Sequence, residues 1–137
     1  MKTFIVFLFL FLFSFSVSYS QHLDRKTIWE CQYILHKDSA NKIFIDKMMG
    51  IGAFQMENDS VLNLTCVCNK GTAKIKFGKD NSVQIGDISR TMLWCDQKNK
   101  ELDFLRYLSL ATAYEVNSTG LKLFIKSKKE YLFFVGH

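Results

Sequence analysis

Apolar and polar side chains alternate with a period of two along much of the chain, and such alternation predicts β-strands. In the first segment, Trp29, Cys31, Tyr33 and Leu35 fall on one face of the expected strand. Residues 69–71, 78–81 and 117–120 are rich in asparagine and glycine, which favour turns. The expected strands span residues 28–35, 43–45, 61–68, 73–77, 83–85, 111–116, 121–125 and 131–135. Residues 48–54 contain two glycines and receive no assignment.

After the last cysteine, apolar residues recur at spacings of three and four, and this pattern predicts one amphipathic helix. Its apolar stripe contains Leu102, Phe104, Leu105 and Leu108. Asp96 precedes the stripe, where it can accept hydrogen bonds from the free N–H groups of the first turn, as an N-cap residue does. We assign the other nearby carboxylates to turn and solvated helix positions: Asp87, Glu101 and Asp103.

The last predicted strand is apolar on both faces, because Tyr131 and Phe133 alternate with Leu132 and Phe134. Either both faces are covered, or one face exposes aromatic side chains to a partner. The predicted helix is the simpler second cover. Alternatively, the sheet curves around an interior that admits an apolar tail. Phe124, Leu132 and Phe134 are the candidate ligand or partner surface.

The chain begins with the pattern of a secretory signal peptide. Lys2 precedes an apolar run over residues 4–13, and the small residues Ser18 and Ser20 fit cleavage between Ser20 and Gln21. The apolar run is shorter than the roughly twenty residues that cross a bilayer. We expect residues 1–20 to be a signal peptide and residues 21–137 to form one domain. The mature protein is expected to be secreted or periplasmic and not to span the membrane.

Charge and motif content argue against several classes of function. Removing Lys2 from the 18 basic residues leaves 17 against 13 acidic residues, a net charge of +4. The basic residues form no arginine-rich run and no nucleic-acid-binding motif, so we expect no nucleic-acid partner. The sequence lacks a nucleophile elbow and a phosphate-binding glycine loop. None of the three histidines has metal-ligand spacing. We therefore predict neither enzymatic activity nor a cofactor or metal.

The order of motifs resembles the META/HslJ domain family over residues 28–134. Cys68-Asn69 ends a strand, a Thr-x-Met-x-Cys-like segment ends at Cys95, and an amphipathic helix and a hairpin follow. Trp29 is similar to the early tryptophan of that family. Together with the strand pattern, the resemblance implies an α+β fold. In this fold a curved antiparallel sheet forms a single domain, partly open and barrel-like, that one amphipathic helix closes.

Four cysteines in an exported domain of this size predict two disulfides. Cys66 and Cys68 lie on one face of one expected strand, with Cα atoms about 6.5–7 Å apart. This separation is at the limit of disulfide geometry, so each is expected to bond to another segment. We favour Cys31–Cys66 and Cys68–Cys95, and the second pair falls on positions similar to the family's cysteines.

The leading hypothesis is an exported, non-enzymatic module that binds a protein partner or an apolar, lipid-like ligand. The resemblance implies envelope, stress-related or secretion-related work. One alternative is a thiol–disulfide oxidoreductase that uses Cys66 and Cys68, which requires an exposed thiolate of low pKa. Another is a secreted effector or inhibitor of a host protein, and it shares the same scaffold. The sequence leaves the oligomeric state open.

Overall fold

The computed structural model describes residues 23–137, so the expected signal peptide and its cleavage site lie outside the described residues. The described chain forms nine strands, one α-helix and a short 3-10 helix. In chain order these are β1 (Ile28–Lys37), β2 (Ile43–Lys47), β3 (Gly52–Asn58), β4 (Val61–Cys66), β5 (Lys70–Phe77), η1 (Lys79–Asn81), β6 (Val83–Arg90), α1 (Lys98–Ser109), β7 (Ala113–Asn117), β8 (Gly120–Phe124) and β9 (Tyr131–Gly136).

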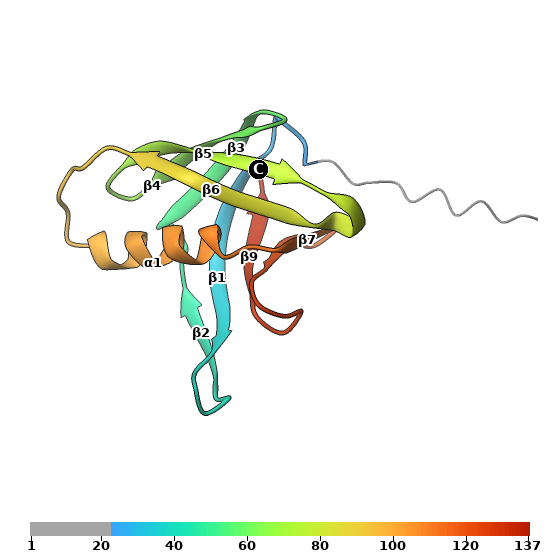
Figure 1. The fold of residues 1–137 in the computed structure, drawn as a ribbon. Coiled ribbons are helices and arrows are strands. Elements are labelled where there is room, and N and C mark those ends of the chain that lie inside the picture. Colours follow the sequence, from blue (N-terminus) through green and yellow to red (C-terminus); the bar gives the residue numbers. More distant parts are fainter. Residues whose placement is uncertain (1–22) are drawn as a thin grey trace, which may run out of the picture.

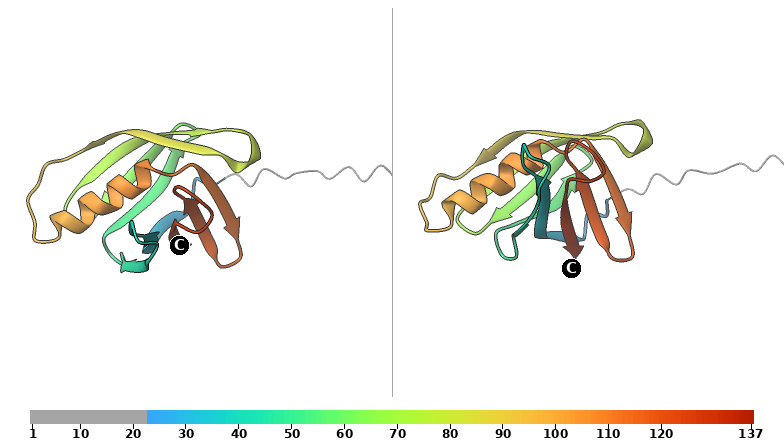
Figure 2. Two further views of the ribbon diagram at one scale, coloured as in Figure 1. Left: turned by 60° about the horizontal axis from the view of Figure 1, so that its bottom comes forward. Right: turned by 90° about the horizontal axis from the view of Figure 1, so that it is seen from below.

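The strands form one antiparallel sheet in the order β6-β5-β4-β3-β1-β9-β8-β7, and β2 pairs with β1 beside this path. The two ends of the sheet meet at one point. There Ser82 bridges Ala113, and the N–H of Val83 donates to the carbonyl of Thr112 at 3.0 Å. The sheet curves around α1, which lies inside the curve (Figures 1 and 2). The partly open, barrel-like sheet closed by one helix is therefore confirmed.

The helix covers the inner face of the sheet with an apolar stripe. Phe104, Leu105 and Leu108 are buried against it, and the Phe104 ring lies 6.4 Å from that of Phe134. Leu102, which was expected in the stripe, is 40% exposed. The buried positions are residues 101, 104, 105 and 108, an i, i+3, i+4, i+7 pattern, and Leu102 falls outside it. Within the described residues, α1 is too short and too polar to cross a membrane.

A β-bulge interrupts the alternation of β1. The strand's register against β9 shifts between Cys31 and Tyr33. Trp29 and Cys31 are buried on the inner face, but beyond the bulge the buried residue is Ile34. The expectation that Tyr33 shares a face with Trp29 and Cys31 is therefore wrong, because one extra residue reverses the facing of all that follows. Tyr33 and Leu35 lie on the outer face.

The two faces of β9 have different surroundings. Leu132 and Phe134 are fully buried on the inner face, where Phe134 packs edge-on against Phe54 at 5.1 Å. Phe124 lies on the outer face, yet only 7% of it is exposed. All three residues of the expected ligand surface are therefore buried: Leu132 and Phe134 on the inner face that the helix covers, and Phe124 on the outer face. Tyr131 remains partly exposed on the outer face.

One glycine allows the helix to approach the sheet closely. A Cβ atom at Gly52, the first residue of β3, would overlap the ring of Phe104. The segment of residues 48–54, which the sequence left unassigned, thus contains the start of a core strand. Gly52 serves close packing rather than a turn. Gly86, in β6, contrasts with it, because a Cβ atom there would meet no other atom within 4 Å.

We predict that Gly52→Ala lowers the free energy of unfolding by about 1–3 kcal/mol, because the new methyl group displaces a fully buried aromatic ring. Urea denaturation measures this change. Gly86→Ala is the matched control, since it adds the same atom to a strand where the space is open, and it should change stability by less than about 0.5 kcal/mol. Equal losses in the two variants would contradict the packing argument.

Candidate functional site

Residues 91–97 connect β6 to α1. Within this connection, residues 91–95 carry the most exposed apolar side chains of the region, and we call them the anchored loop. Met92 is 78% exposed, Leu93 is 64% exposed and Trp94 is 78% exposed. Three adjacent apolar side chains in solvent are unusual, because isolated ones are common but contiguous ones mark interaction sites.

The side chain of Asn69 holds the backbone of the anchored loop. Its Oδ1 accepts hydrogen bonds from the N–H of Leu93 and from the hydroxyl of Thr91, both at 2.8 Å. Its Nδ2 donates to the carbonyl of Leu93 at 3.3 Å. Asn69 is itself buried, at the turn between β4 and β5. Buried Asn69 therefore holds the backbone of the loop, while the apolar side chains of the loop are exposed to solvent.

Glu101 supports Asn69 in turn. This carboxylate is fully buried and accepts hydrogen bonds from the N–H groups of Cys68 and Asn69, at 2.9 and 3.1 Å. It also accepts one from Asn69 Nδ2 at 2.7 Å and pairs with Arg90 at 3.3 Å. A buried carboxylate is stable only when it is satisfied in this way. Its oxygens are occupied by structural donors, so the group serves architecture.

The positions expected from sequence for Glu101 and Asp96 differ from those in the structure. The expectation that Glu101 is solvated is wrong, because it lies three and four residues before Phe104 and Leu105 and so shares their buried face. The N-cap position is Gln97 rather than Asp96, and no side chain caps this end by a hydrogen bond. The spacing of Glu101 from the apolar stripe was the signal that could have revealed its burial.

A disulfide joins Cys68 to Cys95, with Cα atoms 5.8 Å apart. This is one of the two pairs that the sequence favoured. It fastens the end of the anchored loop to the residue before Asn69. The disulfide and the asparagine therefore hold the loop from two adjacent positions of the β4–β5 turn.

The other favoured pair, Cys31–Cys66, is not formed, and both cysteines are free. Strand β3 lies between β1 and β4, so the two residues are separated by about 9.5 Å, or two strand spacings. That separation exceeds the Cα distance of a disulfide. Gly52 of β3 pairs with Cys66, and the ring of Phe104 packs against Gly52. Burial raises the pKa of each free thiol to about 12.

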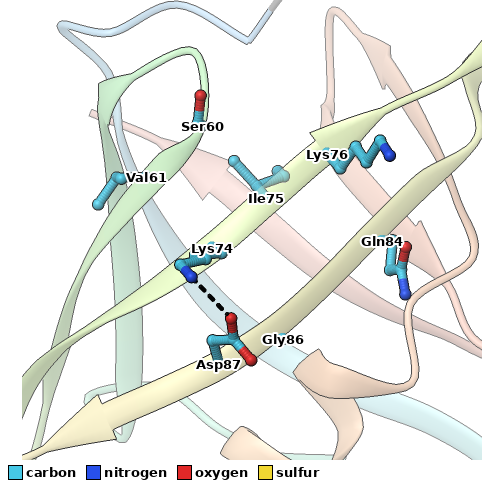
Figure 3. A pocket seen from close by; sticks show the side chains of 8 residues that line it. All are labelled: Ser60, Val61, Lys74, Ile75, Lys76, Gln84, Gly86 and Asp87. Carbon is cyan, nitrogen blue, oxygen red and sulfur yellow. Dashed lines mark ion pairs between the residues drawn. The ribbon is translucent and has the colours of Figure 1, made fainter.

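A separate groove lies over β4, β5 and β6, and Figure 3 shows its lining side chains. Its volume is about 510 Å³, and Lys74 pairs with Asp87 across it at 2.9 Å. Both charged side chains are largely exposed, and such ion pairs contribute little. The groove is lined by Ser60, Val61, Lys74, Ile75, Lys76, Gln84, Gly86 and Asp87. Because its charged groups are solvated, we place the functional site at the anchored loop instead.

The described residues contain no cluster of three or more histidine, cysteine or acidic side chains that could hold a metal ion. The features that the sequence singled out, Cys68-Asn69 and the segment ending at Cys95, are brought together by the fold. The profile of the META domain family matches residues 26–136, nearly the whole of the described chain. The chain belongs to the META domain family.

One solved structure shares the fold of this META domain at low sequence identity. It is the crystal structure of a DUF4847 family protein from Bacteroides vulgatus ATCC 8482, with a TM-score of 0.60 and 16% identity. The alignment covers 81% of this chain and 92% of that chain. No curated protein matches the sequence significantly. The likeness concerns the fold, and the site must be argued from this META domain's own residues.

We predict that Glu101→Gln destabilises the META domain by about 2–3 kcal/mol, because it removes charge-assisted hydrogen bonds and turns an amide donor toward other donors. Urea denaturation gives the loss, and hydrogen exchange should quicken at the N–H groups of Cys68 and Asn69. Asp103→Asn, on the exposed side of the same helix, is the control and should cost less than about 0.5 kcal/mol. Similar costs for both variants would mean that the buried carboxylate does not support the loop.

We predict that Cys68→Ser lowers stability by about 3–4 kcal/mol, the chain-entropy value for a loop closed across a sequence separation of 27 residues. It should also leave Cys95 as a thiol that alkylates readily at pH 8. Cys31 should alkylate only after unfolding, since burial raises its pKa to about 12. An unchanged melting temperature together with an unreactive Cys95 would show that the two cysteines are not bonded in solution.

Proposed function

We propose that this META domain is an exported, non-enzymatic binding module whose anchored loop inserts into an apolar pocket of a protein partner. The observation that carries the proposal is the exposure of Met92, Leu93 and Trp94 on a backbone held in place from beneath. Tryptophan and methionine are enriched at protein interfaces, and tryptophan is prominent among the residues that dominate binding energy. A loop that is already ordered loses little conformational entropy when it binds.

Charges beside the anchored loop favour a partner with an acidic rim. Lys70 begins β5, directly after the turn that holds the loop. Its N–H donates to the hydroxyl of Thr91, and its carbonyl accepts a hydrogen bond from the N–H of Thr91. Lys98 and Lys100 are exposed in the first turn of α1, and Asp96 is the nearest exposed acid in sequence. Charge complementarity of this kind speeds association and fixes the orientation of the partner.

The packing of the sheet supports a surface site over an enclosed ligand. Phe54, Phe104 and Phe134 are fully buried between sheet and helix, where an apolar tail would have to lie. This arrangement favours a protein partner outside over an apolar ligand inside.

Export and the absence of thiol chemistry are parts of the same proposal. A structural disulfide persists in oxidising compartments, which supports export. The oxidoreductase alternative needs a reactive thiolate, whereas burial raises the pKa of Cys66 to about 12 and Cys68 is bonded to Cys95. These observations favour a structural role for sulfur.

We predict that a photoreactive benzoylphenylalanine at position 94 cross-links to one protein of the producing cell or its surroundings. The purified partner should bind Trp94→Ala about 30-fold more weakly than the unmodified domain, the loss typical of a central interface tryptophan. Isothermal titration calorimetry measures both affinities. Lys79→Ala, an exposed substitution on η1, is the control and should leave the affinity unchanged.

Intrinsic fluorescence separates a protein partner from a membrane surface. The sequence has two tryptophans, and Trp29 is buried, so in a Trp29→Phe background the emission reports on Trp94 alone. The partner should shift this emission to shorter wavelength and shield it from iodide. Vesicles of phosphatidylcholine and phosphatidylglycerol should have no effect. A shift with vesicles alone, or equal affinity of Trp94→Ala, would overturn the proposal.

A further inference from the structure

Strand β2 is an edge strand in which exposed apolar residues stand beside the charged residues Asp46 and Lys47. It pairs with β1 on one side, and no described strand pairs with its other side. Soluble proteins normally protect such edges with charged side chains, proline or bulges, because free N–H and C=O groups recruit another strand. Here Ile43 and Ile45 are 58% and 62% exposed. The first part of this edge is therefore apolar and open.

Two hydrogen bonds show which residues of β2 direct their backbone outward. The carbonyl of Lys42 accepts from the residue after β1 at 3.1 Å, and the N–H of Met48 donates to a β1 carbonyl at 2.9 Å. Both residues therefore face β1. Successive residues of an antiparallel strand alternate between its two neighbours. Ile43 and Ile45 consequently present their N–H and C=O groups at the free edge.

The outer face behind this edge is also apolar. Ile45 pairs with Leu35, which pairs on its other side with Tyr131. In the next row Tyr33 stacks on Phe133, with ring centroids 5.2 Å apart. An apolar band thus runs from the free edge across β2, β1 and β9. A strand added at the edge would extend this band rather than end it.

We propose that a second copy of this chain occupies the edge, with the two β2 strands antiparallel about a twofold axis at Phe44. In this register Lys42 lies opposite Asp46 of the second copy, and Ile43 lies opposite Ile45. Each of these contacts occurs twice by symmetry, and Phe44 meets its own copy. Opposite charges and apolar pairs directly across an antiparallel ladder stabilise it.

The same register satisfies the backbone. Ile43 and Ile45, whose N–H and C=O groups point outward, become hydrogen-bonded pairs with one another across the axis. A twofold axis at Ile45 would instead set Phe44 opposite Asp46 and Ile43 opposite Lys47, which matches apolar with charged side chains. Self-complementarity at one register is what identifies the occupant as a second copy.

The edge is accessible to such a copy. β2 and the end of β1 form an arm that extends beyond α1 (Figure 1). Asp46 accepts a hydrogen bond from His36 Nε2 at 2.8 Å, yet half of its side chain, 51%, is exposed. It can therefore receive the lysine of the second copy while it keeps its own partner.

We predict a monomer–dimer equilibrium by sedimentation velocity for residues 21–137, with the dimer populated at micromolar concentrations. Ile45→Lys should shift the domain to monomer, because it sets a lysine opposite an apolar residue at the edge. Ile28→Lys, at an exposed isoleucine (47%) away from the arm, is the control and should remain dimeric. Circular dichroism confirms that both variants fold.

Charge exchange and cross-linking test the register. Lys42→Asp should weaken the dimer about tenfold, since it opposes like charges twice, and the added change Asp46→Lys should restore it. Phe44→Cys should form a disulfide with its own copy on mild oxidation, because non-hydrogen-bonded pairs have Cα atoms about 4.5 Å apart. A domain that stays monomeric at 200 µM (about the upper range of the method), or a cross-link at Ile45→Cys but not at Phe44→Cys, would overturn the proposal.

This inference is independent of the binding role of the anchored loop. Trp94→Ala should remain dimeric, and monomeric Ile45→Lys should keep its affinity for the loop's partner. Loss of dimerisation in Trp94→Ala would contradict the assignment of the interface to β2.

Discussion

The buried carboxylate of Glu101 is the contact on which the organisation of this domain depends. It accepts hydrogen bonds from backbone N–H groups of the turn after β4 and from the side chain of Asn69, and it pairs with Arg90 at the end of β6. A charge without such donors would be too costly in the core, so the position of α1 is coupled to those of β4, β5 and β6. Asn69, held by this carboxylate, then orders the loop between β6 and the helix.

This dependence gives the two ends of the loop different kinds of restraint. The disulfide limits how far Cys95 can move from the β4–β5 turn, and acts even when the chain is unfolded. The hydrogen bonds of Asn69 set the direction of the backbone at Leu93, and they exist only in the folded state. Together they keep apolar side chains in solvent, where hydrophobic burial would otherwise draw a free loop inward.

Local patterns in the sequence predicted the strands of the meander and the one helix, since each depends on a periodicity that neighbouring residues establish. They failed where a contact joins distant segments. Cys31 cannot pair with Cys66 because of the strand order, and the burial of Glu101 depends on donors more than ten residues away. The face of the sheet on which Tyr33 lies was predicted wrongly, because the alternating sequence pattern does not reveal the β-bulge. The family resemblance predicted the fold, and it did not extend to the exposed surfaces.

The anchored loop and the β2 arm are separate parts of the domain, and their sequences suit different kinds of contact. The loop presents side chains on a backbone that Asn69 holds at Leu93, so specificity there would rest on the shape of Met92, Leu93 and Trp94. The arm presents backbone groups, so specificity there rests on register. The two proposed contacts share no residue, so one would leave the other surface free.

The bulge in β1 has a mechanical consequence. Before it, β1 pairs with β3 within the barrel; beyond it, the same strand pairs with β2 in the arm. A bulge increases the local twist and bends its strand. One extra residue therefore bends β1 where the strand passes from the barrel into the arm.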